Sequence, residues 1–444
     1  MSLKTFRGGV HPEEKKELSV GKPIEVYLPK GDLVFPLNQH IGKPAKPVVA
    51  KGDKVLAGQL IAEADGFVSA NIVSSCSGTV KAIEERKLGT GAKATCIVIE
   101  NDGNFTLQEG IGVEKDPDSL SNDEILAAIK KAGIVGMGGA GFPTNVKLMP
   151  KNPDNIEYII ANGCECEPYI TCDDELMKKH ARQIVIAMKL LMQLFENAAG
   201  VIAIEDNKPT AIEAMRGVCA KEKGLSVMPV QTKYPEGGER NLISVVTGRN
   251  LKGGQLPAEL GCLVCNVASL YAIYRACCLN EPLMDRLVTV SGEGVANPHN
   301  MLVKLGTSMA ELVEAAGGAA PGKEIKKVLS GGPMMGIPLI SLDTPLCKNN
   351  NAITVFAEDP VEQAQLQMTA CFRCGRCQQA CPIGLVPQLM ANAAERGDLD
   401  YYEKKLYGLD CFQCGSCTFV CPAKRPLMQT FKQAKAAIMA AKRK

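Results

Sequence analysis

The chain has 444 residues, more than one hydrophobic core can hold, so its length predicts roughly three or four domains. Lys and Arg number 50 against 48 Asp and Glu, a balance that gives no indication of nucleic-acid binding. We expect no secretory signal peptide, because the first residues are polar and charged, and 19 cysteines then indicate a reducing compartment and metal ligation rather than disulfides. The most apolar run, residues 262–274, is too short and too polar to span a bilayer.

The first predicted domain, residues 1–115, is rich in Gly, Val and short polar turns, a composition typical of small β structure. Residues 52–83 resemble the barrel-sandwich fold of biotinyl and lipoyl carrier domains, in which two halves of short strands are each turned by glycine. Those carriers present a lysine in a Glu-x-Asp-Lys hairpin, whereas this chain has Glu63, Ala64, Asp65 and Gly66. Because glycine has no amine for a prosthetic arm, the domain is predicted to be a structural or docking module.

The second predicted domain, residues 116–284, begins with a helix and continues with alternating strands and helices. Ser121 and Glu124 form a capping-box pattern ahead of apolar residues at helical spacing. After a glycine-rich stretch at residues 134–147, we expect strands at 156–161, 201–205 and 226–230, and helices at 174–197 and 209–222. This alternation predicts an α/β layer with a mainly parallel sheet.

The loop from Gly136 to Gly141 would let a flat ring or a phosphate approach its backbone, because glycines have no side chains to collide with it. It does not match the Rossmann fingerprint G-x-G-x-x-G, which opens a strand-turn-helix unit and is followed by an acidic residue about 20 positions later. Taken alone the loop is a weak signal, and a tight structural turn is its default interpretation.

The third predicted domain, residues 285–345, begins with a strand at residues 287–291. Residues 288–318 resemble the small β-grasp ligand-binding modules found beside flavin domains. A plain β-α module without a ligand explains the pattern equally well. The Gly- and Pro-rich stretch at residues 330–345 is interpreted as a linker.

Two cysteine runs, each reading C-x2-C-x2-C-x3-C-P, lie in the last predicted domain, residues 360–444. They supply Cys371, Cys374, Cys377, Cys381, Cys411, Cys414, Cys417 and Cys421. Eight thiolates at this spacing are the ligand set of two 4Fe-4S clusters. Three sulfurs of one run converge on one cluster, while the fourth points toward the other, so we assign Cys421 to the first cluster and Cys381 to the second. Zinc sites close with four ligands, and a disulfide framework would not repeat such a run.

The segment between the two runs, residues 382–410, is helical in composition, which predicts a helical two-cluster domain rather than a compact small ferredoxin. In the final stretch, residues 426–444, one helical face carries Leu427, Phe431, Ala434, Ile438 and Ala441, with lysines around them. Such a helix could lie on a membrane or a membrane subunit. Packing on the cluster domain with a solvated basic tip is the favoured interpretation.

Iron-sulfur clusters pass single electrons, so a chain that couples them to a nicotinamide needs a flavin. Four motifs occur in the order and at about the spacing of the flavin-binding NADH dehydrogenase subunit of respiratory complex I: GMGGAGFPTNVK (136–147), NGCECEP (162–168), YPEGGERNL (234–242) and CNVAS (265–269). With a barrel-sandwich domain before them and two clusters after them, nearly the whole chain resembles the C subunit of the Rnf complex. Rnf complexes are membrane-bound ferredoxin:NAD+ oxidoreductases that pump sodium ions or protons.

The resemblance implies cofactor contacts at the matching positions. FMN would be held by glycines and polar side chains: Gly136, Gly138, Lys147, Asn162, Glu165, Tyr234, Gly237, Gly238 and Asn266. Phe142 would stack on NAD(H), and Glu167 and Glu239 would hydrogen-bond it. The chain departs from complex I at Met137, where that family has arginine, and at Cys164, where it has an acidic residue. A second nucleotide-stacking aromatic has no counterpart here, because Pro150 falls near its place.

The resemblance also implies partners and a location. They are membrane and cluster-bearing subunits of an Rnf-type complex, ferredoxin indirectly, and a peripheral position on the cytoplasmic face of the cell membrane. Two other functions stay open at this point. One is a cobalamin reductase of a microcompartment, although about 130 residues precede the glycine loop here and that family has it near the N-terminus. The other is a non-catalytic iron-sulfur scaffold with a degenerate flavin site, which Met137 and Pro150 support.

Overall fold

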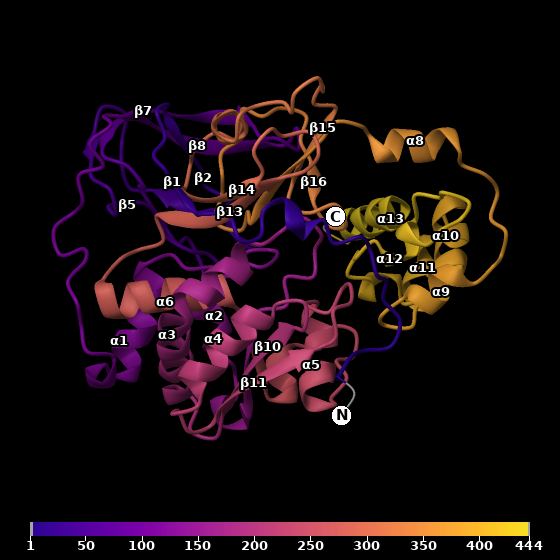
Figure 1. Cartoon of the computed structure of the whole chain (residues 1–444), viewed down its shortest axis with the longest axis horizontal. Coiled ribbons are helices and arrows are strands. Elements are labelled where there is room, and N and C mark those ends of the chain that lie inside the picture. Colours follow the sequence, from indigo (N-terminus) through magenta and orange to yellow (C-terminus); the bar gives the residue numbers. More distant parts are fainter. Residues whose placement is uncertain (1–2, 443–444) are drawn as a thin grey trace.

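The computed structural model describes residues 3–442. Figure 1 shows the N-terminal β structure beside a second, mixed sheet, an α/β layer below them, and a separate helical domain at one side. One continuous group of buried apolar residues runs through the first three parts and includes Phe35, Ile125 and Val288. The helical domain has a core of its own, which contains Tyr402 and Phe431. Among the described residues no helix has the length and apolar character needed to cross a membrane.

The N-terminal domain is a sandwich of two small antiparallel sheets, which confirms the barrel-sandwich prediction. One sheet has the order β2-β8-β7-β4 and the other β3-β5-β6. The strands are β2 (Leu33–Pro36), β3 (Lys46–Pro47), β4 (Lys54–Val55), β5 (Leu60–Glu63), β6 (Ile72–Val73), β7 (Gly78–Lys87) and β8 (Lys93–Asn101). The hairpin that carriers use for their lysine connects β5 to β6.

The second domain is an α/β layer built on four parallel strands in the order β11-β10-β9-β12. These are β9 (Tyr158–Asn162), β10 (Ala199–Glu205), β11 (Leu225–Val230) and β12 (Cys262–Asn266), with helices α1 (Asn122–Lys131), α2 (Thr144–Lys147), α3 (Cys172–Gln193), α4 (Pro209–Cys219), α5 (Glu239–Thr247) and α6 (Val267–Leu279). The predicted capping box of Ser121 and Glu124 is present at α1. The parallel sheet and the alternation that predicted it are confirmed.

The strand order creates a switch point between β9 and β12. From β9 the chain winds outward through β10 and β11, then returns to place β12 on the other side of β9. In such sheets ligands bind outside the carboxyl ends of the strands at this point, because the two connections leave in opposite directions and open a crevice. Asn162 and Asn266 are the last residues of β9 and β12, and they are directly paired in the register.

A six-stranded mixed sheet forms the third domain, in the order β1-β14-β13-β17-β15-β16. Its strands are β1 (Glu25–Tyr27), β13 (Asp285–Ser291), β14 (His299–Lys304), β15 (Lys327–Ser330), β16 (Ile337–Pro338) and β17 (Ala352–Phe356), and α7 (Met309–Ala315) completes it. The linker interpretation of residues 330–345 was therefore wrong. Ser330 in β15 pairs with Ile337 in β16, so residues 330–337 form an antiparallel hairpin. β15 also pairs with β17, which ties this hairpin into the sheet.

The fourth domain is helical, as predicted. It contains α8 (Pro360–Leu366), α9 (Arg376–Ala380), α10 (Pro387–Glu395), α11 (Leu399–Lys404), α12 (Ser416–Phe419) and α13 (Leu427–Ala441). Helix α13 buries Leu427, Phe431, Ala434 and Ile438 against the domain, whereas Ala441 is exposed. The interpretation of α13 as a helix packed on the cluster domain is confirmed.

The first residues of the chain form an arm that connects these domains. Lys4 forms a β-bridge to Val230 at the end of β11, and Val10 forms another to Tyr234. Between these bridges, the amide of Gly9 donates a hydrogen bond to the carbonyl of Ala380, at 2.9 Å. The arm therefore crosses from the α/β layer to the C-terminal end of α9, directly before Cys381.

Candidate functional site

The glycine-rich loop lies at the carboxyl edge of the parallel sheet and exposes its backbone. The amide of Gly136 donates to the carbonyl of Phe142 at 2.8 Å, which closes the loop at its base. The amide of Met137 donates to Oγ of Ser269 at 2.9 Å, and the buried Arg286 donates to the carbonyl of Met137 at 2.6 Å. Residues 138–140 remain exposed. The base of the loop is thus fixed, and its glycine backbone faces outward.

Two asparagines from the strand ends complete the floor beside this loop. A Cβ on Gly138 would lie 2.9 Å from Nδ2 of Asn266, so only glycine fits there without moving that side chain. Nδ2 of Asn266 donates to Oδ2 of Asp173 at 2.6 Å. Nδ2 of Asn162 donates to the carbonyl of Gly237 at 2.9 Å, so the loop after β11 also reaches the floor. The structure therefore gathers four of the predicted flavin contacts around the switch point.

Lys147 brings a positive charge to this edge. It is the last residue of α2, and Nζ donates to the carbonyl of Val264 at 2.7 Å and lies 3.3 Å from Oε1 of Glu239. Both partners lie near the end of β12 or the start of α5. A bare glycine backbone, two amides and one lysine suit a flat ring that carries a phosphate. These residues fit FMN.

Glu165 and Glu167 are engaged by the protein itself. The Glu165 carboxylate accepts the amides of Asp173 at 2.6 Å and Asp174 at 3.3 Å, which caps the start of α3. The Glu167 carboxylate accepts the amides of Met334 at 3.0 Å and Met335 at 2.7 Å from the β15–β16 turn. Burial raises the pKa of both glutamates to about 7. Glu165 explains why α3 begins two residues earlier than predicted, and Glu167 fixes a turn that the sequence did not connect to this site.

Tyr234 faces the cluster domain. Its side chain is buried, and its hydroxyl donates to the carbonyl of Cys414 at 2.6 Å. Nearby, a Cβ on Gly238 would lie 3.6 Å from the ring of Phe412, and one on Gly415 would lie 2.9 Å from the carbonyl of Met334. The loop after β11 and the β15–β16 turn therefore both touch the second cysteine run.

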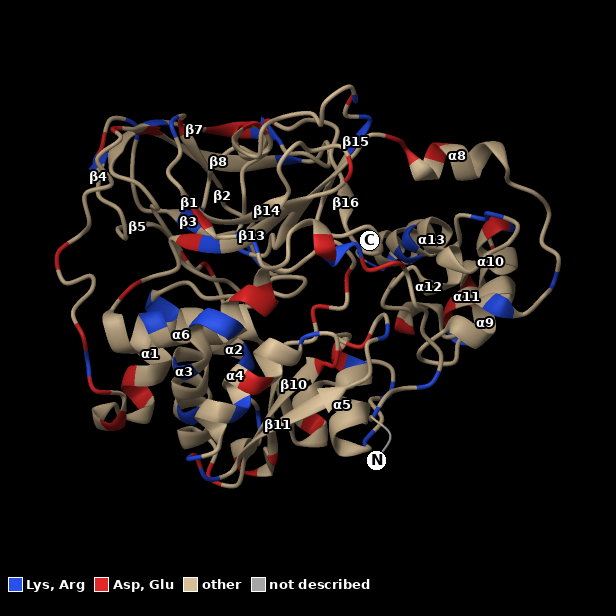
Figure 2. Ribbon diagram, viewed as in Figure 1, with Lys and Arg blue, Asp and Glu red and all other residues tan. Residues whose placement is uncertain are grey.

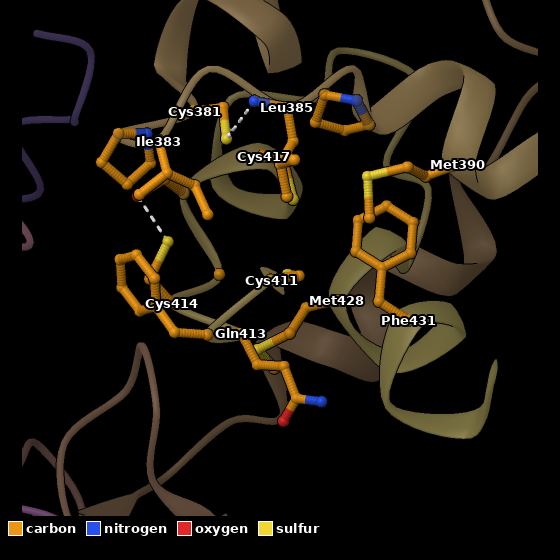
Figure 3. Close-up of a pocket in the computed structure, with 15 residues that line it drawn as sticks. Cys381, Ile383, Leu385, Met390, Cys411, Gln413, Cys414, Cys417, Met428 and Phe431 are labelled. Atoms are coloured by element: carbon orange, nitrogen blue, oxygen red, sulfur yellow. Dashed lines mark hydrogen bonds between the residues drawn. The ribbon is translucent and has the colours of Figure 1, made fainter. Parts of the chain in front are cut away.

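Four cysteines line one cavity beside these contacts. They come from both runs: Cys381, Cys411, Cys414 and Cys417. Figure 3 shows them around a common space that Met428 and Phe431 close on the α13 side. This is the crossed set predicted from the spacing, with the fourth cysteine of the first run joined to the second run. Thiolates enclosed by apolar side chains are the environment that a 4Fe-4S cluster needs. We call this group the inner cysteine set.

The other four cysteines of the two runs, which we call the outer set, are Cys371, Cys374, Cys377 and Cys421. Cys371 and Cys374 are exposed, and Cys377 and Cys421 are half-buried. Burial raises the pKa of the Cys377 thiol. One cysteine set thus lies against the α/β layer, while the other reaches the surface.

Three features of the site carried no clear signal in the sequence. Arg286 supports the glycine loop from the third domain, the turn near Met334 connects Glu167 to the cluster loop, and the arm around Gly9 connects Tyr234 to Ala380. The pair Gly8-Gly9 was the one available hint, since adjacent glycines mark close backbone approaches.

Comparison with known families identifies each domain. Residues 4–104 match the RnfC barrel sandwich hybrid domain, and residues 129–275 match the Nuo51 FMN-binding domain. Residues 287–338 match the SLBB domain, and residues 367–425 match the 4Fe-4S dicluster domain. The chain therefore carries FMN-binding and two-cluster iron-sulfur domains.

Curated relatives match the chain along its length. The C subunit of the proton-translocating ferredoxin:NAD(+) oxidoreductase complex of Clostridium ljungdahlii is 44% identical over 99% of this chain and 95% of its own length. The C subunit of the Na(+)-translocating ferredoxin:NAD(+) oxidoreductase complex of Acetobacterium woodii is 38% identical over 99% of this chain and 98% of its own length. The C subunit of the ion-translocating oxidoreductase complex of Rhodobacter capsulatus is 40% identical over 98% of this chain and 83% of its own length. None of these relatives supports the cobalamin reductase or the non-catalytic scaffold. The chain belongs to the family of C subunits of ion-translocating Rnf oxidoreductase complexes.

Proposed function

We propose that the chain is the subunit of an Rnf-type complex that exchanges electrons with NAD(H). It would pass them between NAD(H), FMN and two 4Fe-4S clusters. The contact between Tyr234 and Cys414 carries this proposal, because it places the inner cysteine set directly against a loop of the flavin floor. Electron transfer needs its centres to be held close together. In this chain a buried hydrogen bond of 2.6 Å between two domains provides that positioning.

The residues that would hold FMN are the ones around the switch point. The exposed backbone at Gly138 would face the ring, Lys147 would meet the phosphate, and Asn162 and Asn266 would hydrogen-bond the ring edge. When bound, FMN supplies the exchange between two-electron and one-electron transfer. Glu167 would hydrogen-bond the nucleotide while it also fixes the Met334 turn.

The two cysteine sets suggest an order for electron transfer. The inner set touches the flavin side through Tyr234, so its cluster would exchange electrons with FMN. The outer set presents Cys371 and Cys374 to solvent, beside Phe372 with 60% of its surface exposed. Its cluster would therefore exchange electrons with a partner. We propose that this partner is a cluster-bearing or membrane subunit, that ferredoxin is reached through it, and that the chain lies on the cytoplasmic face of the membrane.

Single-ligand variants of the reconstituted full chain test the order. Cys381→Ser should perturb the inner cluster, and Cys421→Ser the outer one, although each residue belongs to the other run in sequence. Electron paramagnetic resonance should show that NADH still reduces the inner cluster in Cys421→Ser. In Cys381→Ser neither cluster should be reduced at the wild-type rate. Reduction of the outer cluster at that rate in Cys381→Ser would contradict the proposed order.

A second experiment tests the nucleotide side. The wild-type holoprotein should reduce ferricyanide with NADH, whereas a scaffold without a working flavin site would show no NADH-dependent rate. Glu167→Gln should weaken NADH use and leave the iron content unchanged, because the carboxylate lies outside both cysteine sets. Loss of iron in this variant would instead assign Glu167 a purely structural role through the Met334 turn.

A further inference from the structure

The turn between β15 and β16 is the part of the third domain that reaches the cluster domain. A Cβ on Gly415 would lie 2.9 Å from the carbonyl oxygen of Met334, so the turn packs directly against the loop of the second cysteine run. Gly415 follows Cys414, a member of the inner cysteine set, and its φ of +83° is one that glycine adopts without strain. The third domain therefore contacts the backbone that carries an inner cysteine.

This turn is held rigidly from two sides. The carbonyl of Gly331 accepts a hydrogen bond from Oγ1 of Thr354 in β17, at 2.7 Å. The amide of Gly336 donates to the carbonyl of Gly332 at 2.9 Å and closes the turn. The carboxylate of Glu167 accepts the two amides at the tip. The sheet of the third domain and the α/β layer together fix the position of the turn.

Met334 is the buried side chain of this turn. Its exposed fraction is 9%, whereas that of its neighbour Met335 is 45%. Met334 belongs to a small buried apolar group to which the N-terminal arm, the α/β layer and both cysteine runs also contribute. The buried members of this group are Val10, Tyr234, Met334, Ala380 and Cys414. Segments from four parts of the chain thus pack together where the inner cysteine set meets the rest of the molecule.

Dry packing of this kind affects a 4Fe-4S cluster through the charge of the cluster. Reduction adds one negative charge, and burial away from water disfavours the more highly charged form. Solvent exposure and hydrogen bonds to the sulfurs are among the factors that set the reduction potential. The side chain of Met334 has no charge and no hydrogen-bond donor. A methionine packed with an inner cysteine therefore favours a lower potential than water in the same place would.

We propose that the third domain is a docking module for the cluster domain, and that Met334 is a positioning residue that keeps water from the inner cysteine set and so lowers the reduction potential of its cluster. This inference rests on the proposed function, in which that cluster exchanges electrons with FMN. The third domain resembles ligand-binding modules, and in this chain its β15–β16 turn binds the chain's own cysteine loop. The turn is thus part of the junction between the flavin floor and the clusters.

The test is a redox titration with dithionite of the full chain loaded with FMN and both clusters, followed by electron paramagnetic resonance. The inner signal is the one that Cys381→Ser changes. At a fixed potential, Met334→Ala should raise the ratio of reduced to oxidised inner cluster about tenfold, which is 59 mV for one electron. Met334→Leu restores an apolar side chain and should keep the wild-type ratio. Met335→Ala removes the exposed neighbour and should leave the ratio unchanged.

Gly332→Ala tests the same contact without changing Met334. A Cβ on Gly332 would collide with Oε2 of Glu167 and lie 2.9 Å from its Cβ, so the turn must move. The inner ratio should shift in the same direction as in Met334→Ala, and this variant decides the question where Met334→Ala takes up no inner cluster.

Two results would overturn the inference. One is an inner ratio within twofold of the wild type in Met334→Ala or in Gly332→Ala. The other is an equal shift of the inner and outer clusters, because it would show a general loosening of the cluster domain. A wild-type holoprotein whose clusters NADH does not reduce would refute the proposed function, whereas the dithionite titration would still decide the role of Met334.

Discussion

Replacing Gly8 with alanine should release the N-terminal arm from the inner cysteine set. Gly8 has a φ of +81°, and a Cβ there would lie 2.7 Å from the carbonyl oxygen of Cys381 and 3.0 Å from its carbonyl carbon. Both are backbone atoms, so no side chain can rotate away. Gly21 offers a matched control, because its φ is +74° and nothing lies within 4 Å of the added carbon.

The two substitutions share one cost and differ in another. Alanine in the left-handed region costs about 1 kcal/mol at either position. Overlap with fixed atoms adds about 1–3 kcal/mol, and only Gly8→Ala has it. Each 1.4 kcal/mol changes an opening equilibrium about tenfold. At Gly8 the two costs together are about 2–4 kcal/mol, so the arm should open roughly 30- to 700-fold more often in Gly8→Ala than in the wild type.

Hydrogen exchange followed by mass spectrometry measures this opening. The relevant amides are those of Gly9 and Val10, which donate to Ala380 at 2.9 Å and to Tyr234 at 2.8 Å. They should exchange faster by that factor in Gly8→Ala, and at the wild-type rate in Gly21→Ala. Exchange within twofold of the wild type in Gly8→Ala, or equal acceleration in both variants, would refute the reasoning.

Three further substitutions probe the buried polar groups. Tyr234→Phe leaves the buried carbonyl of Cys414 without its donor and should lower the free energy of unfolding by about 1–2 kcal/mol. Tyr402→Phe is the control: the Tyr402 hydroxyl lies 3.4 Å from its acceptor, so its removal should lower Tm less. Equal losses of Tm in the two variants would contradict this. Burial, with nearby Glu205, raises the pKa of Glu236 from 4.5 to about 8, so the folded protein holds a proton that the unfolded chain has lost between these values. The contribution of this group to the free energy of unfolding is therefore present at low pH and declines as pH rises toward 8. The Tm of Glu236→Gln minus the Tm of the wild type should rise between pH 5 and pH 9. A Tm difference that stays constant over this range would contradict the prediction. The Lys348 ammonium donates to the carbonyl of Gly133 at 2.7 Å and to the carbonyl of Asn71. Lys348→Met leaves both carbonyls without a donor, so it should lower the free energy of unfolding by about 2–4 kcal/mol and lower Tm with it. An unchanged Tm would show that water replaces the amine.

Local patterns predicted the position of Cys381 beside the second cysteine run and the start of α1 well. The place of Cys381 beside Cys411, Cys414 and Cys417 follows from a spacing of a few residues, whereas the matching place of Cys421 beside the first run stays a prediction. The capping box of Ser121 and Glu124 is likewise decided within one turn of helix. The start of α3 was predicted less well, because its cap comes from Glu165, which precedes the helix by seven residues.

The nucleotide side of the site was harder to predict. The resemblance to the complex I subunit identified Asn162 and Asn266, but only the strand order shows that they are paired neighbours at a switch point. The same holds for Glu167, whose carboxylate is engaged by amides more than 160 residues away. Partners at such separations leave no periodic signal in the sequence.

The sequence by itself indicated the four kinds of domain and the parallel sheet. Cysteine spacing indicated the two-cluster domain, alternating strands and helices indicated the parallel sheet, and the resemblance indicated the barrel-sandwich, flavin and β-grasp domains. Only the tertiary structure decided how the domains meet: the arm from Gly9 to Ala380, the contact of Tyr234 with Cys414, and the hydrogen bond from Ile41 of the barrel-sandwich domain to Gly141. These contacts are made by backbone groups and single side chains. Any residue can supply a backbone amide or carbonyl, so the amino-acid types alone do not reveal which segments pair.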